Sequence, residues 1–188
     1  MNKQDLSPAS FIGVRGSNII SFGSGEPDLP PPKEIYNVLP HYRDFRYGTI
    51  QGIEPLRNIL AKQYPQSTSE SFVITNGASE ALDLTLRVIS NLESGLPKKI
   101  LISKPFYYSY PRIIEYAGME PITVNTIEGQ IDIDDLRRKI DNCRAIIINS
   151  PSNPTGFGYT QKELEALGEV LKKNKNVFIL SDDIYEHI

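Results

Sequence analysis

The sequence predicts an α/β protein in which a mostly parallel sheet lies between two layers of helices. Short apolar segments of strand length alternate along the chain with segments that carry apolar residues at helical spacing. This alternation is typical of parallel strands joined by helices that cover both faces of a sheet. With 188 residues and a hydrophobic fraction of 39%, the chain is long enough for one domain or slightly more.

Composition excludes several classes of protein. The net charge of -3 and the lack of a basic run argue against nucleic acid as a partner. No apolar run is long enough to span a membrane and no signal peptide is apparent, so we expect a soluble, cytoplasmic protein. The single cysteine, Cys143, excludes a disulfide framework and is interpreted as a buried thiol at a strand edge. His41 and His187 lack partners at metal-ligand spacing, so no metal site is predicted.

The first part of the chain is predicted to be an arm followed by a short strand and a loop. Residues 1–18 show little apolar periodicity, and Ile19–Phe22 has the composition of a strand. The next segment, Gly23–Pro32, is rich in glycine and proline. It is either a linker or a loop in which the Gly25 amide faces a small anion.

A helix is expected over residues 53–64, with Pro55 in its first turn, where proline is tolerated. Its apolar positions at helical spacing are Ile53, Leu56, Ile59 and Leu60. Tyr47 precedes this helix on a loop bounded by glycine. From the residues alone, Tyr47 is equally well a packed tyrosine or a hydrogen-bond donor to a ligand.

The next unit is a predicted strand, Phe72–Thr75, that leads through a glycine into a helix ending near Ile89. Gly77, Ala78 and Ser79 stand at the start of that helix. Free N–H groups beside the positive end of a helix dipole bind phosphate well, and Ser79 adds a hydroxyl. The alternative is an ordinary helix cap without a ligand.

An aromatic loop follows the predicted strand over residues 99–102. Tyr107 in this loop can stack on a flat ring or simply pack against its neighbours. The helix after the loop is expected to bury one face, which consists of Tyr110, Ile113, Ile114 and Ala117.

The remaining elements continue the alternation, with strands over 121–124, 145–148 and 177–180 and helices over 131–140 and after residue 160. Asp132 or Asp134 is the expected N-cap of the first of these helices. Thr160 and Glu163 have the spacing of a capping box. The helix that they open is expected to bury Leu164, Leu167 and Leu171.

Polar residues follow the last two strands of the predicted sheet. Asn153 lies among prolines and a glycine in Asn149–Gly156, where a stiff backbone aims its amide. Asp182 and Tyr185 follow the final strand. Since parallel strands bind ligands at their carboxyl ends, we expect these loops to converge with Tyr107 along one edge of the sheet. Taken singly, such loops are more often plain turns.

Together these groups provide an anion site, an aromatic face, an amide, a carboxylate and a phenol. A flat cofactor with a phosphate, a ring nitrogen and a ring hydroxyl uses all five, and pyridoxal 5'-phosphate is such a cofactor. A carboxylate that faces the pyridine nitrogen keeps the ring protonated and able to accept electrons.

At this point the chain resembles the fold-type I pyridoxal-phosphate enzymes, in particular the class I/II aminotransferases similar to aspartate aminotransferase. The resemblance covers residues 19–188 and follows the order of the family's motifs. The matching segments are Gly25–Asp28, Tyr47–Gly48, Gly52–Arg57, Asn76–Leu82, Asn153–Gly156 and Ser181–His187.

The resemblance implies a role for each matching residue. Gly77, Ala78 and Ser79 would bind the cofactor phosphate, and Tyr107 would stack on the ring. Asn153, Asp182 and Tyr185 would contact the ring, and Asp182 and Tyr185 are the implied catalytic residues. Gly25 and Asn153 would bind substrate, and Tyr47 would reach the phosphate of the neighbouring subunit in a homodimer. These residues are all present in the sequence.

The resemblance also implies a fragment of a larger fold. Residues 1–45 would be the N-terminal arm and substrate loop, and 46–188 part of the large cofactor-binding domain. The implied reaction is transfer of an amino group from an amino acid to a 2-oxo acid, as in amino-acid metabolism. The family's Schiff-base lysine lies beyond Ile188, so we expect the chain to be inactive alone. Alternatives are a C-S lyase, an amino-acid decarboxylase or a non-catalytic cofactor-binding domain.

Overall fold

The structure is a computed structural model that describes residues 18, 20 and 29–187. It separates into two compact units, residues 1–50 and residues 51–188. Apart from Ile20, the predicted strand at 19–22 lies outside the described residues, and so does Gly25 with most of its loop.

The described part of the first unit contains a short helix, α1 (Lys33–Val38), and a 3-10 turn, η2 (Leu39–His41). None of the residues in these two elements is buried. After them, the rings of Tyr42 and Phe45 meet edge to face, with 5.4 Å between their centroids. The described apolar side chains of this unit, such as Val38 and Leu39, are therefore largely exposed.

The second unit is built on a four-stranded parallel sheet in the order β2-β1-β5-β6. Its strands are β1 (Lys99–Ser103), β2 (Glu120–Val124), β5 (Ala145–Asn149) and β6 (Phe178–Asp182). Their register places Leu101 opposite both Ile122 and Ile146. A small antiparallel hairpin, β3 (Thr126–Ile127) and β4 (Gln130–Ile131), follows β2.

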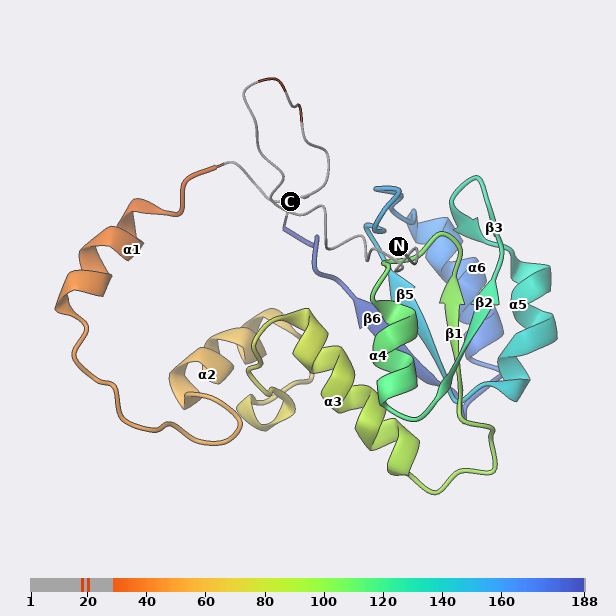
Figure 1. The fold of residues 1–188 in the computed structure, drawn as a ribbon, viewed down its shortest axis with the longest axis horizontal. Helices are drawn as coiled ribbons and strands as arrows, with labels where there is room; N and C mark the ends of the chain where they lie inside the picture. The colour runs from red at the N-terminus through yellow and green to blue at the C-terminus, as the bar shows by residue number, and fades with distance from the viewer. Residues whose placement is uncertain (1–17, 19, 21–28, 188) are drawn as a thin grey trace, which may run out of the picture. The chain divides into compact units, whose positions relative to one another are not determined.

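Of the five described helices of this unit, three connect the strands of the sheet and two precede β1 (Figure 1). They are α2 (Glu54–Gln63), α3 (Ala78–Asn91), α4 (Tyr110–Tyr116), α5 (Ile133–Lys139) and α6 (Gln161–Leu171), with 3-10 turns η3 (Ser69–Ser71) and η4 (Ile140–Asn142). Asp132 caps α5, since its carboxylate accepts hydrogen bonds from the N–H groups of Asp134 and Asp135. The capping box of Thr160 and Glu163 opens α6 as predicted.

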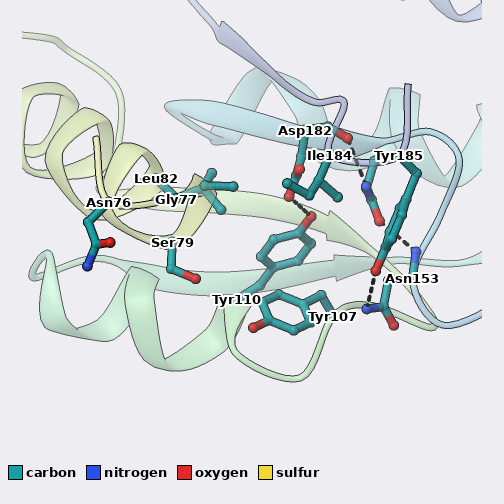
Figure 2. A pocket seen from close by; sticks show the side chains of 12 residues that line it. Asn76, Gly77, Ser79, Leu82, Tyr107, Tyr110, Asn153, Asp182, Ile184 and Tyr185 are labelled. Carbon is teal, nitrogen blue, oxygen red and sulfur yellow. Dashed lines mark hydrogen bonds between the residues drawn. The ribbon is translucent and has the colours of Figure 1, made fainter. Parts of the chain in front are cut away.

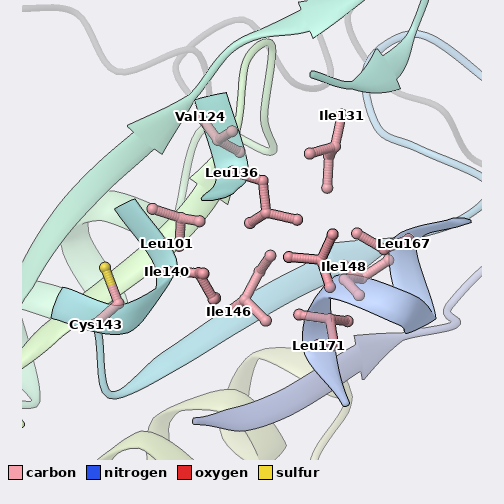
Figure 3. Close-up of a cluster of buried hydrophobic side chains, with 11 residues drawn as sticks. Leu101, Val124, Ile131, Leu136, Ile140, Cys143, Ile146, Ile148, Leu167 and Leu171 are labelled. Carbon is pink, nitrogen blue, oxygen red and sulfur yellow. The ribbon is translucent and has the colours of Figure 1, made fainter. Parts of the chain in front are cut away.

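Each face of the sheet carries its own buried apolar cluster. Because side chains alternate along a strand, Leu101 of β1 packs on one face while Ile100 and Ile102 pack on the other. On the first face, Leu136 of α5 and Leu167 of α6 cover the sheet (Figure 3). The opposite face is covered by α3 and α4, through Leu86, Ile89, Tyr110 and Ile114. The predicted three-layer α/β architecture is confirmed.

The prediction of a strand over Phe72–Thr75 is wrong, because this segment does not pair with any strand of the sheet. Its apolar composition suits a strand, but a strand needs a ladder of hydrogen bonds to a neighbour. Here the N–H of Ile74 donates to the carbonyl of Gln51 at 2.9 Å, and no ladder follows in the described part. Residue 131 is likewise not helical, since it belongs to β4 and the helix begins at Ile133.

Some predicted apolar faces are less buried than expected. Ile53, the N-cap of α2, and Ile59 within it are 58% and 55% exposed, and Leu164 of α6 is 43% exposed. The final strand is also open, because Phe178 and Ile179 are both exposed although they point to opposite faces of the sheet. By contrast, every residue of β5 is buried.

Cys143 is buried, as expected, and its thiol donates to the carbonyl of Lys139 at 3.3 Å. Burial raises the pKa of this thiol to about 11. In the part of the chain that the structure describes, no helix is both long and apolar enough to cross a membrane.

Candidate functional site

A pocket of about 240 Å³ lies where the carboxyl ends of the strands meet the N-terminus of α3. It brings together side chains and backbone from four separate parts of the sequence (Figure 2). The predicted site residues that line it are Gly77, Ala78, Ser79, Tyr107, Asn153, Asp182 and Tyr185.

The N-terminus of α3 forms one end of the pocket. Gly77 is its N-cap, with a φ of 82° that only glycine adopts readily, and no side chain caps the helix. The N–H groups of Ala78 and Ser79 have no acceptor among the described residues. The carboxylate of Glu80 accepts from the N–H of Asn76, one residue before the cap. This end of the pocket therefore presents free donors and the positive end of a helix dipole, which suits an anion.

Asp182, the last residue of β6, supplies the carboxylate of the pocket. Its Oδ2 accepts a hydrogen bond from the hydroxyl of Tyr110 at 2.5 Å. The pKa of Tyr110 is raised, mainly by burial and next by the hydrogen bond to Asp182. The hydroxyl therefore stays protonated and remains a donor. The other carboxylate oxygen of Asp182, Oδ1, has no partner in the described part of the chain. One carboxylate oxygen is thus held in place while the other can accept from a ligand.

Asn153 and Tyr185 meet on another side of the pocket. The Asn153 amide Nδ2 donates to the Tyr185 hydroxyl oxygen at 3.1 Å (Figure 2). Because that oxygen accepts from Asn153, the proton of the Tyr185 hydroxyl is available to a ligand. Two side chains that lie 32 residues apart in the sequence are thereby joined at their polar ends.

Tyr107 lies in the loop between β1 and α4 and is half-buried. Its ring meets that of Tyr110 at an interplanar angle of 84°, with 5.5 Å between the centroids. A second edge contact, with Tyr108, has a centroid distance of 4.8 Å. These two edge contacts hold the Tyr107 ring in place, and the ring forms one apolar wall of the pocket.

Two predicted site residues are not among those that line this pocket. Gly25 lies outside the described residues. Tyr47 belongs to the unit of residues 1–50, and its side chain is fully exposed. No lysine of the described chain lines the pocket either. Lys104 is exposed. Its backbone N–H donates to the carbonyl of Val124, and its carbonyl accepts from the hydroxyl of Thr126.

Three polar residues that line the pocket, Asn76, Tyr110 and Asn149, were not among the predicted site residues. Tyr110 was expected only on the buried face of its helix, although it stands one helical turn after Tyr107 at the end of a strand. Asn149 is a polar residue that ends an otherwise apolar strand. That position, at the carboxyl end of a parallel strand, was the signal that could have identified it.

The sequence profile described as Aminotransferase class I and II matches residues 17–188 of this chain. The chain belongs to this family. Among curated proteins, it is 37% identical over 186 residues to one from Rickettsia typhi named "Probable aspartate/prephenate aminotransferase", a match that covers 92% of this chain and 45% of that protein. It is 32% identical over 192 residues to the aspartate aminotransferase of Bacillus subtilis, with coverages of 96% and 48%.

Solved structures show the same similarity. A Thermus thermophilus aspartate aminotransferase double mutant superposes with a TM-score of 0.75 at 29% identity, over 88% of this chain and 45% of that one. A Pyrococcus furiosus alanine aminotransferase gives a TM-score of 0.73 at 30% identity, with coverages of 86% and 43%. The chain thus spans about half the length of the curated relatives and solved structures that it matches.

Proposed function

We propose that this chain is the cofactor-binding part of a pyridoxal-phosphate-dependent aminotransferase, which transfers an amino group from an amino acid to a 2-oxo acid. Family membership supports the reaction class. The observation that carries the proposal is the convergence of the α3 N-terminus, Tyr107, Asn153, Asp182 and Tyr185 on one pocket.

The residues of the pocket fit the cofactor. The unpartnered N–H groups of Ala78 and Ser79 would bind its phosphate, and Tyr107 would lie against the ring. The free oxygen of Asp182 would accept from the protonated ring nitrogen, while Tyr110 holds the other oxygen. Asn153 and Tyr185 would bind the ring hydroxyl. When bound, pyridoxal phosphate supplies an electron-accepting ring.

The finer features of the function extend the same proposal. The relatives named aspartate and aspartate/prephenate aminotransferases make aspartate the first amino donor to test. Gly25 would contribute to substrate binding, and Tyr47 would contact the cofactor phosphate of a second subunit in a homodimer. Residues 1–45 would form the arm and substrate loop, and 46–188 the cofactor-binding part. A cytoplasmic location is part of this proposal.

No lysine among the described residues lines the pocket, so we expect none of them to form a covalent bond with the cofactor there. This chain should therefore bind the cofactor without a covalent bond. After treatment with equimolar pyridoxal phosphate and borohydride, any adduct is expected to be spread over exposed lysines, and the chain should not transfer nitrogen from aspartate to 2-oxoglutarate. A stoichiometric borohydride-stable adduct on one lysine would contradict the expectation, because that lysine would then have reacted as a site residue.

Non-covalent binding is tested with pyridoxamine 5'-phosphate, which lacks the aldehyde and cannot react with lysine. We expect Asp182→Asn to weaken its binding about 10- to 100-fold, as loss of a hydrogen bond to a charged group does. Asp183→Asn is the matched control, because Asp183 is the exposed neighbour and does not line the pocket. Equilibrium dialysis measures both affinities. Equal affinities for the wild type and Asp182→Asn, or no binding by the wild type, would overturn the proposal.

A further inference from the structure

Asn149, the last residue of β5, is buried with 9% of its surface exposed, and both ends of its amide are used. Its Oδ1 accepts a hydrogen bond from the backbone N–H of Asn153 at 2.7 Å. Its Nδ2 donates to the backbone carbonyl of Asp182 at 2.8 Å. A single side chain thus joins the ends of two strands and the loop between β5 and α6.

These two partners determine the orientation of the amide. A backbone N–H can only donate and a carbonyl can only accept, so Oδ1 must face Asn153 and Nδ2 must face Asp182. Asn149 and Asp182 are also opposite each other in the register of β5 and β6. The amide therefore adds a side-chain bond at the last rung of a ladder that begins at Ala145 and Phe178.

Both residues that Asn149 holds by their backbone present side chains to the pocket. The Asn153 amide reaches the hydroxyl of Tyr185 at 3.1 Å, and the Asp182 carboxylate accepts from Tyr110 at 2.5 Å (Figure 2). We propose that Asn149 is a positioning residue that holds the ring-binding side of the pocket, through Asn153 and Asp182. This inference rests on the proposed function, since it assigns a ring to that side. The inferred role of Asn149 concerns the ring-binding side alone, because its side chain makes no hydrogen bond to the phosphate end at α3.

Two substitutions test the two hydrogen bonds of the Asn149 side chain separately and together. Asn149→Asp keeps an oxygen for the Asn153 N–H but replaces the donor to Asp182 with a second oxygen. Asn149→Leu, which keeps the number and branching of the side-chain heavy atoms, removes both contacts. Asn174→Asp and Asn174→Leu are the matched controls, because the Asn174 amide also donates to a backbone carbonyl, that of Val170 at 3.0 Å, and does not line this pocket.

The first measurement is backbone hydrogen exchange by NMR on the ligand-free chain. We expect Asn149→Leu to speed exchange at the Asn153 N–H about tenfold, whereas Asn149→Asp leaves that amide protected. The amides of β1 should keep their wild-type rates in both variants. Unchanged exchange at Asn153 in Asn149→Leu would overturn the inference. Faster exchange throughout β1 and β5 would also overturn it, because Asn149 would then act on general stability.

The second measurement is equilibrium dialysis with pyridoxamine 5'-phosphate and, separately, inorganic phosphate. Both Asn149 variants should bind pyridoxamine 5'-phosphate about tenfold more weakly than the wild type, with unchanged affinity for inorganic phosphate. Equal losses for the two ligands, or no loss, would overturn the positioning role and leave the proposed function standing. No binding of pyridoxamine 5'-phosphate by the wild type would overturn the proposed function, while hydrogen exchange still decides whether Asn149 holds Asn153.

Discussion

Tyr110 connects a buried helix face to the carboxylate of the candidate site. Its ring packs in the apolar cluster beneath α4, and its hydroxyl donates to Asp182 at 2.5 Å. A carboxylate oxygen that accepts such a bond cannot also rotate freely into the pocket. The tyrosine therefore leaves one defined oxygen of Asp182 to meet a ligand.

We expect Tyr110→Phe to weaken the binding of pyridoxamine 5'-phosphate by a factor of about 3 to 10, because it removes one hydrogen bond to Asp182 and keeps the ring. Equilibrium dialysis measures the affinity. Tyr116→Phe is the control, since Tyr116 lies on the same helix and is 70% exposed. An affinity of Tyr110→Phe equal to that of the wild type would show that Asp182 needs no such support.

Asp135 is a second carboxylate whose neighbours determine its charge. It is nearly buried and accepts from Lys139 Nζ at 2.7 Å and from the N–H of Asn125 at 2.9 Å. The hydrogen bond from Lys139, aided by that from Asn125, lowers its pKa from 3.8 to about 2. Because the folded state lowers this pKa, Asp135 stabilises the fold above pH 3.8, and this contribution is lost as the pH falls towards about 2.

The stability of the wild type should therefore fall between pH 3.8 and about 2 more steeply than that of Asp135→Asn. Urea unfolding at several pH values measures the free energy of unfolding in each case. Asp134→Asn serves as the control, because the Asp134 side chain is 76% exposed. Parallel pH profiles for the wild type and Asp135→Asn would contradict the assigned role.

Among the elements, α3 forms with its N-terminus the end of the pocket that we propose to bind an anion. Gly77 enters the helix with φ 82° and ψ 173°, a backbone region that is essentially restricted to glycine. A side chain at this position would meet no neighbouring atom, so the conformational cost alone opposes substitution. A backbone change that relieved this strain would also change the direction of the first N–H groups of the helix.

Gly77→Ala is expected to lower the free energy of unfolding by about 1–3 kcal/mol and to weaken the binding of inorganic phosphate. Urea unfolding and equilibrium dialysis measure the two effects. Gly158→Ala is the control, because a Cβ at Gly158 also meets no neighbour and its φ lies outside the region reserved for glycine. If Gly77→Ala retained both stability and phosphate affinity, the cap would not depend on glycine.

At the scale of the whole molecule, the sheet is covered unevenly. The inner strand β5 is buried along its length, whereas β6, at the edge of the sheet that the structure describes, exposes Phe178 and Ile179 by 43% and 51%. An edge strand with free backbone groups and exposed apolar side chains readily pairs with another chain. We therefore expect the 188-residue chain to associate with itself as its concentration rises.

Ile179→Lys should reduce this association, because a charge on an edge strand opposes pairing with a second strand. Sedimentation velocity over a range of protein concentrations measures the effect. Asn176→Lys adds the same charge at an exposed position just before β6 and should leave the association unchanged. Identical concentration dependence in the wild type and Ile179→Lys would show that association uses another surface.

The sequence by itself determined most of the helices and strands, because these depend on residues close together in the chain. The Thr160–Glu163 capping box and the buried run at 145–148 were recognised locally, and both are confirmed. Phe72–Thr75 shows the limit of such reasoning. Its composition suits a strand, but no partner strand lies beside it in the described structure.

Only the tertiary structure decided which polar groups meet. Helical spacing placed Tyr110 on a buried face, but the strand order β1-β5-β6 brings its hydroxyl to Asp182, which lies 72 residues later. The same order places Asn149 beside Asp182 and turns the end of an apolar strand into a hydrogen-bonding bridge. Such contacts depend on the pairing and packing of distant segments, and no local pattern of residues specifies them.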